Sequence, residues 1–248
     1  MNLKILGIYI GACSGASIFE NDKIIFATSE ERFSRIKADE AYPKKSIDNA
    51  LEFSQISSND LDAIVIAGNE IALTYMLTKV FSGFSINDYQ FAMKEFWRPK
   101  LSSKSNPLFL DLFKSKIISD QFPFTDEKIN EIIKFEHGDW PSTYTDYIKQ
   151  FFTDALVTHL GVDKNKIHFL DHHQCHAAYA LYSSPIRDNN TLIFTADAHG
   201  DGLSGTISKF DKDTNKIIRL KKYFPKNFQL GRIYRYTTLL LRMLPEHH

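Results

Sequence analysis

Residues 3–29 read LKILGIYIGACSGASIFENDKIIFATS, and this stretch decides the fold class. It holds three short apolar segments, which lie at residues 3–10, 16–20 and 23–29. A glycine-bounded turn follows the first segment, and the dipeptide Asn21-Asp22 separates the last two, as in a tight β-hairpin. The stretch therefore predicts three antiparallel strands in sequence order.

A helix and a buried strand are predicted next, and the whole order then recurs. After Pro43, apolar residues return at helical spacing, and residues 61–67 (LDAIVIA) form a nearly continuous apolar run typical of a buried parallel strand. A second set of three strands and a helix is predicted at residues 191–196, 203–210, 216–223 and 230–244. The chain is therefore predicted to hold a β-β-β-α order twice, the second time without its closing strands.

Residues 71–162 differ in composition from the segments on either side, because stretches rich in Phe, Tyr and Lys alternate there with short polar stretches. We expect a mostly helical insertion, whose last helix covers residues 143–160 and ends at Gly161. A strand at residues 166–170 and a helix at residues 172–183 follow it. The predicted organisation is a first subdomain of residues 1–70 and 163–188, the helical insertion 71–162, and the truncated start of a second subdomain at residues 189–248.

A three-strand meander, a crossover helix and parallel strands, present twice, are the pattern of the ribonuclease-H-like fold of actin-like ATPases and sugar kinases. The predicted fold class is thus α/β, with one full copy, one incomplete copy and the helical insertion. By analogy with that fold, the two glycine-bearing first turns would face a shared cleft.

The composition limits the classes of function. With 30 basic and 30 acidic residues the net charge is zero, which argues against a protein that coats nucleic acid or an anionic membrane surface. No apolar run approaches the roughly 20 residues that cross a bilayer. The two cysteines, Cys13 and Cys175, are too few for a disulfide framework. We expect a cytoplasmic protein with neither nucleic-acid nor membrane partners.

The strongest candidate site is the segment DHHQCH at residues 171–176. His172 and His176 stand four residues apart, which on a helix places both imidazoles on one face, whereas His173 points elsewhere. Asp197 ends the next predicted strand, where a carboxylate can reach the same cleft. Two histidines and an aspartate would suit a divalent metal such as iron, manganese or zinc. The alternatives are a helix start with exposed histidines and an aspartate that only forms a turn.

Two further groups of residues are candidates for binding phosphate. The loop predicted after Asp197 holds glycines whose backbone amides can meet phosphate, and the charged segment at residues 30–37 holds basic side chains that suit an oxyanion. The candidate nucleotide- or phosphate-binding residues are Gly200, Asp201, Gly202, Arg32, Arg35 and Lys37. For the basic group the alternative is a solvated loop with mutual salt bridges. The basic run at residues 219–222 is expected to face solvent from a strand.

Several short segments occur together in the order found in one enzyme family. They are residues 30–37 (EERFSRIK), Tyr42-Pro43, residues 171–178, residues 183–185, residues 197–201, Phe224-Pro225, Leu230-Gly231, Tyr234 and Thr237. With these segments the chain resembles the N-terminal part of the NodU/CmcH-type O-carbamoyltransferases, which are relatives of the universal tRNA threonylcarbamoyl transferase. The insertion contributes no segment to the resemblance.

The resemblance implies a two-site enzyme. A C-terminal domain, absent from this chain, would make carbamoyl adenylate from carbamoyl phosphate and ATP. The actin-like N-terminal domain would then pass the carbamoyl group to a hydroxyl of a natural product or glycan. The resemblance also implies a divalent metal held by His172, His176 and Asp197, with a further aspartate ligand later than residue 248. On this interpretation the chain is a fragment that would not complete the reaction alone.

The chain departs from the family pattern at the first turn. Where the family usually has a histidine just before the Ala-Ser of that turn, this chain has Ser14-Gly15 before Ala16-Ser17. The sequence therefore singles out no catalytic residue. Two other classes of function stay open. One is a non-catalytic actin-like module that binds nucleotide or metal, and the other is a metal-dependent hydrolase on another α/β fold that uses His172, His176 and Asp197.

Overall fold

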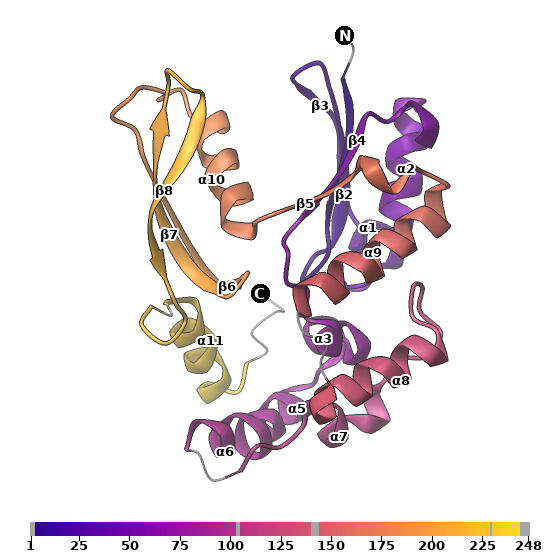
Figure 1. Cartoon of the computed structure of the whole chain (residues 1–248). Helices are drawn as coiled ribbons and strands as arrows, with labels where there is room; N and C mark the ends of the chain where they lie inside the picture. The colour runs from indigo at the N-terminus through magenta and orange to yellow at the C-terminus, as the bar shows by residue number, and fades with distance from the viewer. Residues whose placement is uncertain (1–2, 103–104, 140–143, 229, 244–248) are drawn as a thin grey trace.

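A computed structural model describes residues 3–102, 105–139, 144–228 and 230–243, arranged around two β-sheets (Figure 1). The first sheet has five strands in the order β3-β2-β1-β4-β5. They are β1 (Lys4–Tyr9), β2 (Gly15–Glu20), β3 (Lys23–Ser29), β4 (Ala63–Ala67) and β5 (Ile167–Leu170). β1 pairs antiparallel with β2 and parallel with β4, so the sheet is mixed. The predicted meander and parallel strands are confirmed.

The turn between β2 and β3 shows how the sequence sets this meander. Asn21 and Asp22 have φ angles of 48° and 63°, as both central residues of a type I′ turn require. Asn and Asp adopt positive φ at lower cost than other residues that carry a Cβ, so this dipeptide favours the tight reversal. The hairpin then pairs Glu20 with Lys23 at its end.

One face of the first sheet is covered by two helices, α2 (Lys44–Ser54) and α9 (Tyr144–Leu160). Leu6, Ile18 and Ile64, which alternate with less buried neighbours along their strands, are fully buried in the core between sheet and helices. The helix predicted at residues 143–160 is confirmed from its second residue onward, and residue 143 lies outside the described residues.

The charged segment at residues 30–37 differs from the solvated loop that was one expectation for it. It contains a short helix, α1 (Glu31–Ser34), and Glu30 is buried. Glu30 Oε2 accepts hydrogen bonds from the backbone N–H (2.8 Å) and the hydroxyl (2.7 Å) of Ser46, in the first turn of α2. The carboxylate therefore stabilises the start of α2, where the helix dipole favours negative charge.

A buried ion pair joins the segment before α2 to the insertion. Asp39, with only 2% of its side chain exposed, accepts a hydrogen bond from Lys79 Nζ at 2.9 Å. Burial opposes ionisation of Asp39, but hydrogen bonds from Ser34 and Lys79 outweigh it and hold the pKa of the carboxyl below its usual value. The carboxylate is therefore the form that stabilises this contact.

The insertion is mostly helical, as predicted. Its helical elements before α9 are α3 (Leu73–Thr78), α4 (Val80–Gly83), α5 (Ile86–Phe91), the π-helical turn Ala92–Trp97, α6 (Arg98–Leu101), α7 (Phe109–Leu112), the short turn Lys114–Lys116, α8 (Asp126–Lys134) and a second π-helical turn Phe135–Asp139. The elements from α4 to α7 build a second apolar core, in which the rings of Phe84, Phe109 and Phe113 pack together, whereas the buried residues of α8 belong to the core of the first sheet. Leu239, from the last helix α11 (Leu230–Leu240), joins the same core.

The second sheet is an antiparallel meander of β6 (Leu192–Gly200), β7 (Leu203–Asp211) and β8 (Lys216–Tyr223). The helix α10 (His172–Ser183) follows β5 directly and packs on this second sheet. Ala177 and Leu181 of α10 form an apolar cluster with Ile193 and Phe210. Although α10 lies in residues 163–188, which were assigned to the first subdomain, its packing partner is thus the second sheet.

Three details of this part differ from the predictions. β6 continues to Gly200, so residues 197–200 belong to a strand and not to a loop. α11 ends at Leu240, and residue 244, its predicted end, lies outside the described residues. Arg219 does not face solvent as expected but forms an ion pair with Asp171, because β8 passes beside the start of α10.

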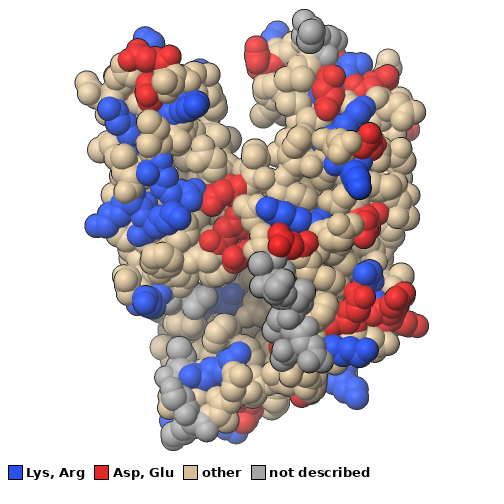
Figure 2. All heavy atoms as spheres, in the orientation of Figure 1, with Lys and Arg blue, Asp and Glu red and all other residues tan. Residues whose placement is uncertain are grey.

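The two sheets stand side by side, with the helical insertion below them (Figure 1). In the space-filling view a notch separates the upper parts of the two sheets and ends above the insertion (Figure 2). The architecture is a mixed α/β fold in which a β-β-β-α order occurs twice.

Candidate functional site

The two histidines of the candidate metal site lie at the start of α10. Asp171 caps this helix, since its Oδ1 accepts a hydrogen bond from the N–H of Gln174 at 2.8 Å. His172 and His176 are one turn apart and share a face, as predicted from their spacing. His173 is buried on another side, where its Nδ1 lies 2.9 Å from Thr195 Oγ1 on β6.

Asp197 reaches the same place from an irregularity in β6. The pairing of β6 with β7 is interrupted between Ala196 and Gly200, so the three residues between them leave the regular ladder. A hairpin turn at Asp201 and Gly202, with φ angles of 48° and 73°, then closes the strand pair. The irregularity directs Asp197 toward α10 at the end of the sheet.

The three side chains converge. The Nε2 atoms of His172 and His176 are 3.0 Å apart, and Asp197 Oδ2 lies 2.6 Å from the first and 3.6 Å from the second. All three candidate ligand atoms lie within 4.8 Å of one another. His172 is largely buried, whereas His176 has 52% of its side chain exposed.

Gly200 is the residue that makes room for His172. A Cβ at this position would lie 2.1 Å from His172 Cδ2 and 2.4 Å from Cγ, far inside ordinary contact distance. The ring can therefore occupy its place beside Asp197 only because residue 200 has no side chain.

The electrostatics of the cluster favour an ionised carboxylate. Burial opposes ionisation of Asp197, but hydrogen bonds from His172 and His176 outweigh it and hold the pKa of Asp197 well below its usual range. The same contact with Asp197 raises the pKa of His176. Burial, together with the charge of Asp197, raises the pKa of the nearby Tyr9 to about 12, so its hydroxyl stays protonated.

The donor set fits a divalent metal ion. Two imidazole nitrogens and one carboxylate oxygen are ligands that zinc, iron and manganese accept. Two nitrogens bound at about 2.0–2.1 Å with an angle between about 90° and 109° are about 3 Å apart, close to the separation of the two histidine nitrogens. His172, His176 and Asp197 would therefore hold such an ion with small adjustments of the side chains.

Asp201 lies next to this cluster but is fully engaged with the protein itself. Its Oδ1 accepts hydrogen bonds from the backbone N–H groups of Asn69 and Glu70, each at 2.8 Å. Its Oδ2 accepts from the N–H of His172 at 2.7 Å and from Asn69 Nδ2 at 3.0 Å. The carboxylate thus fastens the turn of the second sheet to the end of β4 and to the start of α10.

The structure does not bring the basic candidates to the histidine cluster. Arg32, Arg35 and Lys37 are exposed. Arg32 lines a separate, shallow groove on the first sheet together with Cys13 and Ser29. Of the predicted phosphate-binding residues, Gly200 alone lines the cavity that contains His172 and Asp197, and the phosphate role of all six stays a prediction.

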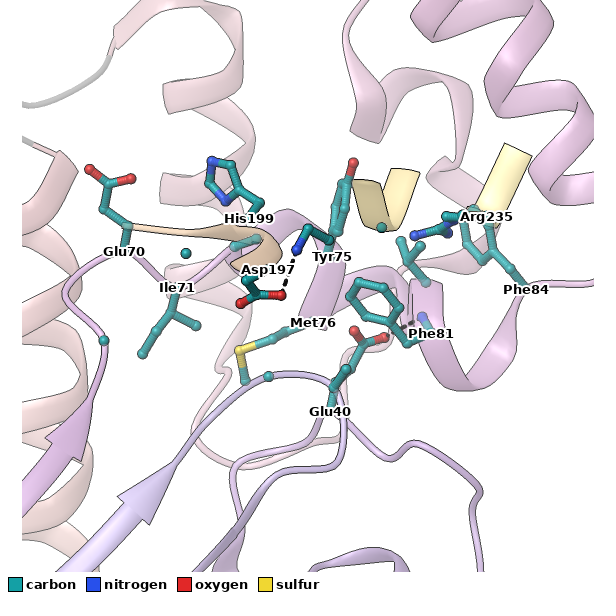
Figure 3. A pocket seen from close by; sticks show the side chains of 18 of the residues that line it. Glu40, Glu70, Ile71, Tyr75, Met76, Phe81, Phe84, Asp197, His199 and Arg235 are labelled. Carbon is teal, nitrogen blue, oxygen red and sulfur yellow. Dashed lines mark hydrogen bonds between the residues drawn. The ribbon is translucent and has the colours of Figure 1, made fainter. Parts of the chain in front are cut away.

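That cavity has a volume of about 520 Å³ and lies between the two sheets and the insertion (Figure 3). Glu70 and Ile71 lie at one end of it, Asp197 and His199 lie nearer the middle, and Phe81, Phe84 and Arg235 lie toward the other end. Sequence reasoning missed the residues at the second end. Arg235 is on α11 and the rings are on the insertion, so neither group has a local signal that predicts their meeting.

None of the helices in the described part of the chain has the length and the apolar character needed to cross a lipid bilayer.

Comparison with known proteins gives the family. The carbamoyltransferase N-terminus family matches residues 4–246. The nodulation protein NolNO of Sinorhizobium fredii is 25% identical over 221 residues, which are 89% of this chain and 24% of that protein. The uncharacterized protein MJ1051 of Methanocaldococcus jannaschii is 36% identical over 64 residues, which are 26% of this chain and 12% of that protein. The chain thus spans about a quarter of the length of the nodulation relative. These matches confirm the resemblance noted in the sequence, and the chain belongs to the carbamoyltransferase N-terminus family.

Proposed function

We propose that this chain is the N-terminal, group-transferring part of an ATP-dependent O-carbamoyltransferase. The family match over nearly the whole chain supports a transferase. The convergence of His172, His176 and Asp197, beside a cavity that His172 and Asp197 line, is the observation that carries the proposal, because it gives this family member a preformed place for chemistry. The repeated β-β-β-α order, with a cavity between its two sheets, supports the actin-like interpretation of the fold.

The reaction proposed is transfer of a carbamoyl group from carbamoyl adenylate to an alcohol. The oxygen of the acceptor hydroxyl forms a bond to the carbamoyl carbon, the bond from that carbon to the phosphate oxygen breaks, AMP leaves, and the hydroxyl proton is released. Carbamoyl phosphate and ATP would supply the adenylate through a separate C-terminal domain, for which the length of the nodulation relative leaves room. We place the reaction in the cytoplasm, in keeping with the two unpaired cysteines.

Each group of residues has a part in this proposal. His172, His176 and Asp197 would hold a divalent ion, iron, manganese or zinc, which when bound polarises a carbonyl group as a Lewis acid. Asp197 stays ionised and keeps both imidazoles oriented through its contacts with their Nε2 atoms. Gly200, Asp201 and Gly202 remain candidates for the nucleotide end of the donor. Arg32, Arg35 and Lys37 remain candidates for an oxyanion such as carbamoyl phosphate, in their own groove or beside it.

A metal analysis tests the central claim. We expect the purified chain to bind one equivalent of zinc or manganese, and His176→Ala to lower the affinity by about 10–100-fold or more, since the ligand itself is lost. His176 is exposed, so the substitution leaves the core intact. His168→Ala is the matched control, because His168 is an exposed histidine on β5 that is outside the cluster. Equal binding by the three proteins would contradict the metal assignment.

A transfer assay tests the reaction class. The full-length gene product that includes this chain is incubated with ATP, carbamoyl phosphate and a panel of alcohols. Formation of carbamoyl adenylate and of a carbamate ester supports the proposal. Release of phosphate from carbamoyl phosphate without any adenylate would contradict it and favour a hydrolase.

A further inference from the structure

We propose that the aromatic end of the cavity binds the body of the carbamoyl acceptor, and that this acceptor is an uncharged alcohol with an aromatic or alicyclic ring system. This inference rests on the proposed function and assigns a role to the helical insertion. It names the class of acceptor, and it excludes a polyhydroxylated sugar as the ligand of the aromatic end of the cavity, which we call the aromatic chamber.

The chamber and the histidine cluster belong to one continuous cavity. Figure 3 shows Glu70 and Ile71 at one end, Asp197 with Met76 and Tyr75 beside it nearer the middle, and Phe81 and Phe84 toward the other end. A volume of about 520 Å³ lies within the usual range of sites that enclose a small molecule. An acceptor whose ring system fills the far end can therefore present its hydroxyl near Asp197.

The walls of the chamber are apolar rings supplied by the insertion. Tyr75, Phe81, Phe84, Trp97 and Phe109 line it, and all five lie within residues 71–162. Phe84 and Phe109 also belong to the second apolar core, where their rings are held by edge and stacked contacts with neighbouring rings. The orientation of the wall is thus fixed by packing, as a preformed site requires.

The cavity is partly open, and ring surface along its wall is left uncovered by the protein. Here Tyr75, Met93 and Trp97 are packed against the core but keep part of their surface toward the cavity. Apolar surface left uncovered inside a fold is unfavourable, and a ring-shaped ligand that covers it recovers that free energy.

Three of the polar groups around the chamber, on Tyr89, Glu40 and Arg235, already have partners. The hydroxyl of Tyr89 donates to the carbonyl oxygen of Val80 at 2.7 Å. Glu40 Oε1 accepts from the N–H of Phe81 at 3.0 Å. The guanidinium of Arg235 lies over the rings of Phe81 and Tyr89, 5.5 Å and 4.8 Å from their centroids. A sugar placed there would lose its hydrogen bonds to water and would contact mainly aromatic rings. Several of its hydroxyls would then be buried without hydrogen-bond partners, which costs binding free energy.

The chemistry of transfer agrees with this division of the cavity. The reacting hydroxyl is the one polar group that the acceptor must expose at the Asp197 end. The rest of the molecule contributes binding through ring contacts, and such contacts hold the hydroxyl in place while the carbamoyl carbon is attacked.

Direct binding measurements test the inference without any carbamoyl donor. The 248-residue chain is titrated with phenylpropanol and with cyclohexylmethanol, and in parallel with methyl glucoside and N-acetylglucosamine, by saturation-transfer NMR and calorimetry. We expect the two ring alcohols to bind at least about tenfold more tightly than the two sugars. Equal or tighter binding of the sugars would overturn the inference, and so would failure of both ring alcohols to bind.

Matched variants place the binding in the chamber. Phe81→Ala should weaken binding of phenylpropanol by about tenfold or more, whereas Phe91→Ala should leave it within about twofold. Phe91 is on the same insertion and is 42% exposed, but it does not line the cavity. Met93→Trp, which adds bulk at the wall of the chamber, should block binding as well, and it serves as the test if Phe81→Ala fails to fold. Unchanged binding by both chamber variants would overturn the inference.

The outcome can be separated from that of the proposed function. If ring alcohols bind in a Phe81-dependent way but the full-length gene product transfers no carbamoyl group, the ligand-binding role of the chamber is supported and the proposed transferase activity is refuted. If carbamoyl is transferred to sugars and this transfer is unchanged in Phe81→Ala, the binding role of the chamber is refuted and the proposed transferase activity is supported.

Discussion

The substitution Gly200→Ala tests the geometry of the histidine cluster without removing any candidate ligand. The added methyl group would lie 2.1 Å from His172 Cδ2, and ordinary contact begins at 3.4 Å, so the ring would have to move by about 1.3 Å. Gly200 does not have a positive φ, so no backbone strain confuses the result. A shift of that size breaks the 2.6 Å contact between His172 and Asp197, and overpacking of this kind costs about 1–3 kcal/mol.

The assay is competition for zinc with a chromophoric chelator, together with urea unfolding. We expect Gly200→Ala to bind zinc about 10–100-fold more weakly than the wild type, the usual loss when a residue that orients a ligand is changed. Gly231→Ala is the control on the same cavity. Its new methyl group would meet Ala198 at an ordinary 3.5 Å, and alanine in a helix should raise the free energy of unfolding by about 0.5–1 kcal/mol.

Two results would refute this reasoning. If Gly200→Ala binds zinc as the wild type does, the His172 ring does not occupy the position that the close approach of Gly200 implies. If Gly231→Ala loses zinc to the same extent, any added methyl group in this cavity disturbs the site, and the specific contact with His172 explains nothing.

Three further substitutions have defined outcomes. Asp201→Asn should lower the free energy of unfolding by about 1–3 kcal/mol and speed hydrogen exchange of the Asn69 amide; unchanged exchange would show that the contact is not formed. Glu30→Gln should also cost about 1–3 kcal/mol in urea unfolding, because the buried carboxylate stabilises the start of α2, and a neutral result would contradict that role. Hydrogen bonds, including that from Lys79, lower the pKa of Asp39 in the folded protein. The ionised carboxylate therefore stabilises the fold at pH values above about 3.9, the pKa of an unfolded aspartate, and this stabilisation is lost as the pH falls through the lower pKa of the folded state. The stability difference between the wild type and Asp39→Asn should therefore shrink below about pH 4, and a difference that grows on acidification would contradict this sign.

Local patterns in the sequence were enough to predict most elements of the fold. The Asn21-Asp22 turn and the alternating apolar strands depend on neighbours in the chain, and both are confirmed. The four-residue spacing of His172 and His176 is likewise a local property of a helix, so the shared face could be predicted.

What the sequence could not indicate depends on contacts between distant segments. The roles of Glu30 and Asp201 come from hydrogen bonds to backbone groups far along the chain, and an acidic residue gives no sign of which amide it will meet. The expectation of a loop was wrong for residues 197–200 for the same reason, because pairing with β7 extends β6 to Gly200, whereas Asp201 and Gly202 do form a turn. The aromatic chamber needs the insertion and α11 to pack together, which no local pattern predicts.

The position of the histidine cluster within the architecture has a mechanical consequence. His172 and His176 are on α10, which packs on the second sheet, and Asp197 is on a strand of that sheet. The ring-lined walls belong to the insertion on the other side of the cavity. A rigid rotation of one sheet against the other would thus widen or narrow the cavity while the three ligand distances stay constant. Such a rotation would have to turn about the hydrogen bonds of Asp201 and the packing of Leu239 in the insertion core, since both join the two sides, and it would change the width of the cavity without changing the ligand cluster.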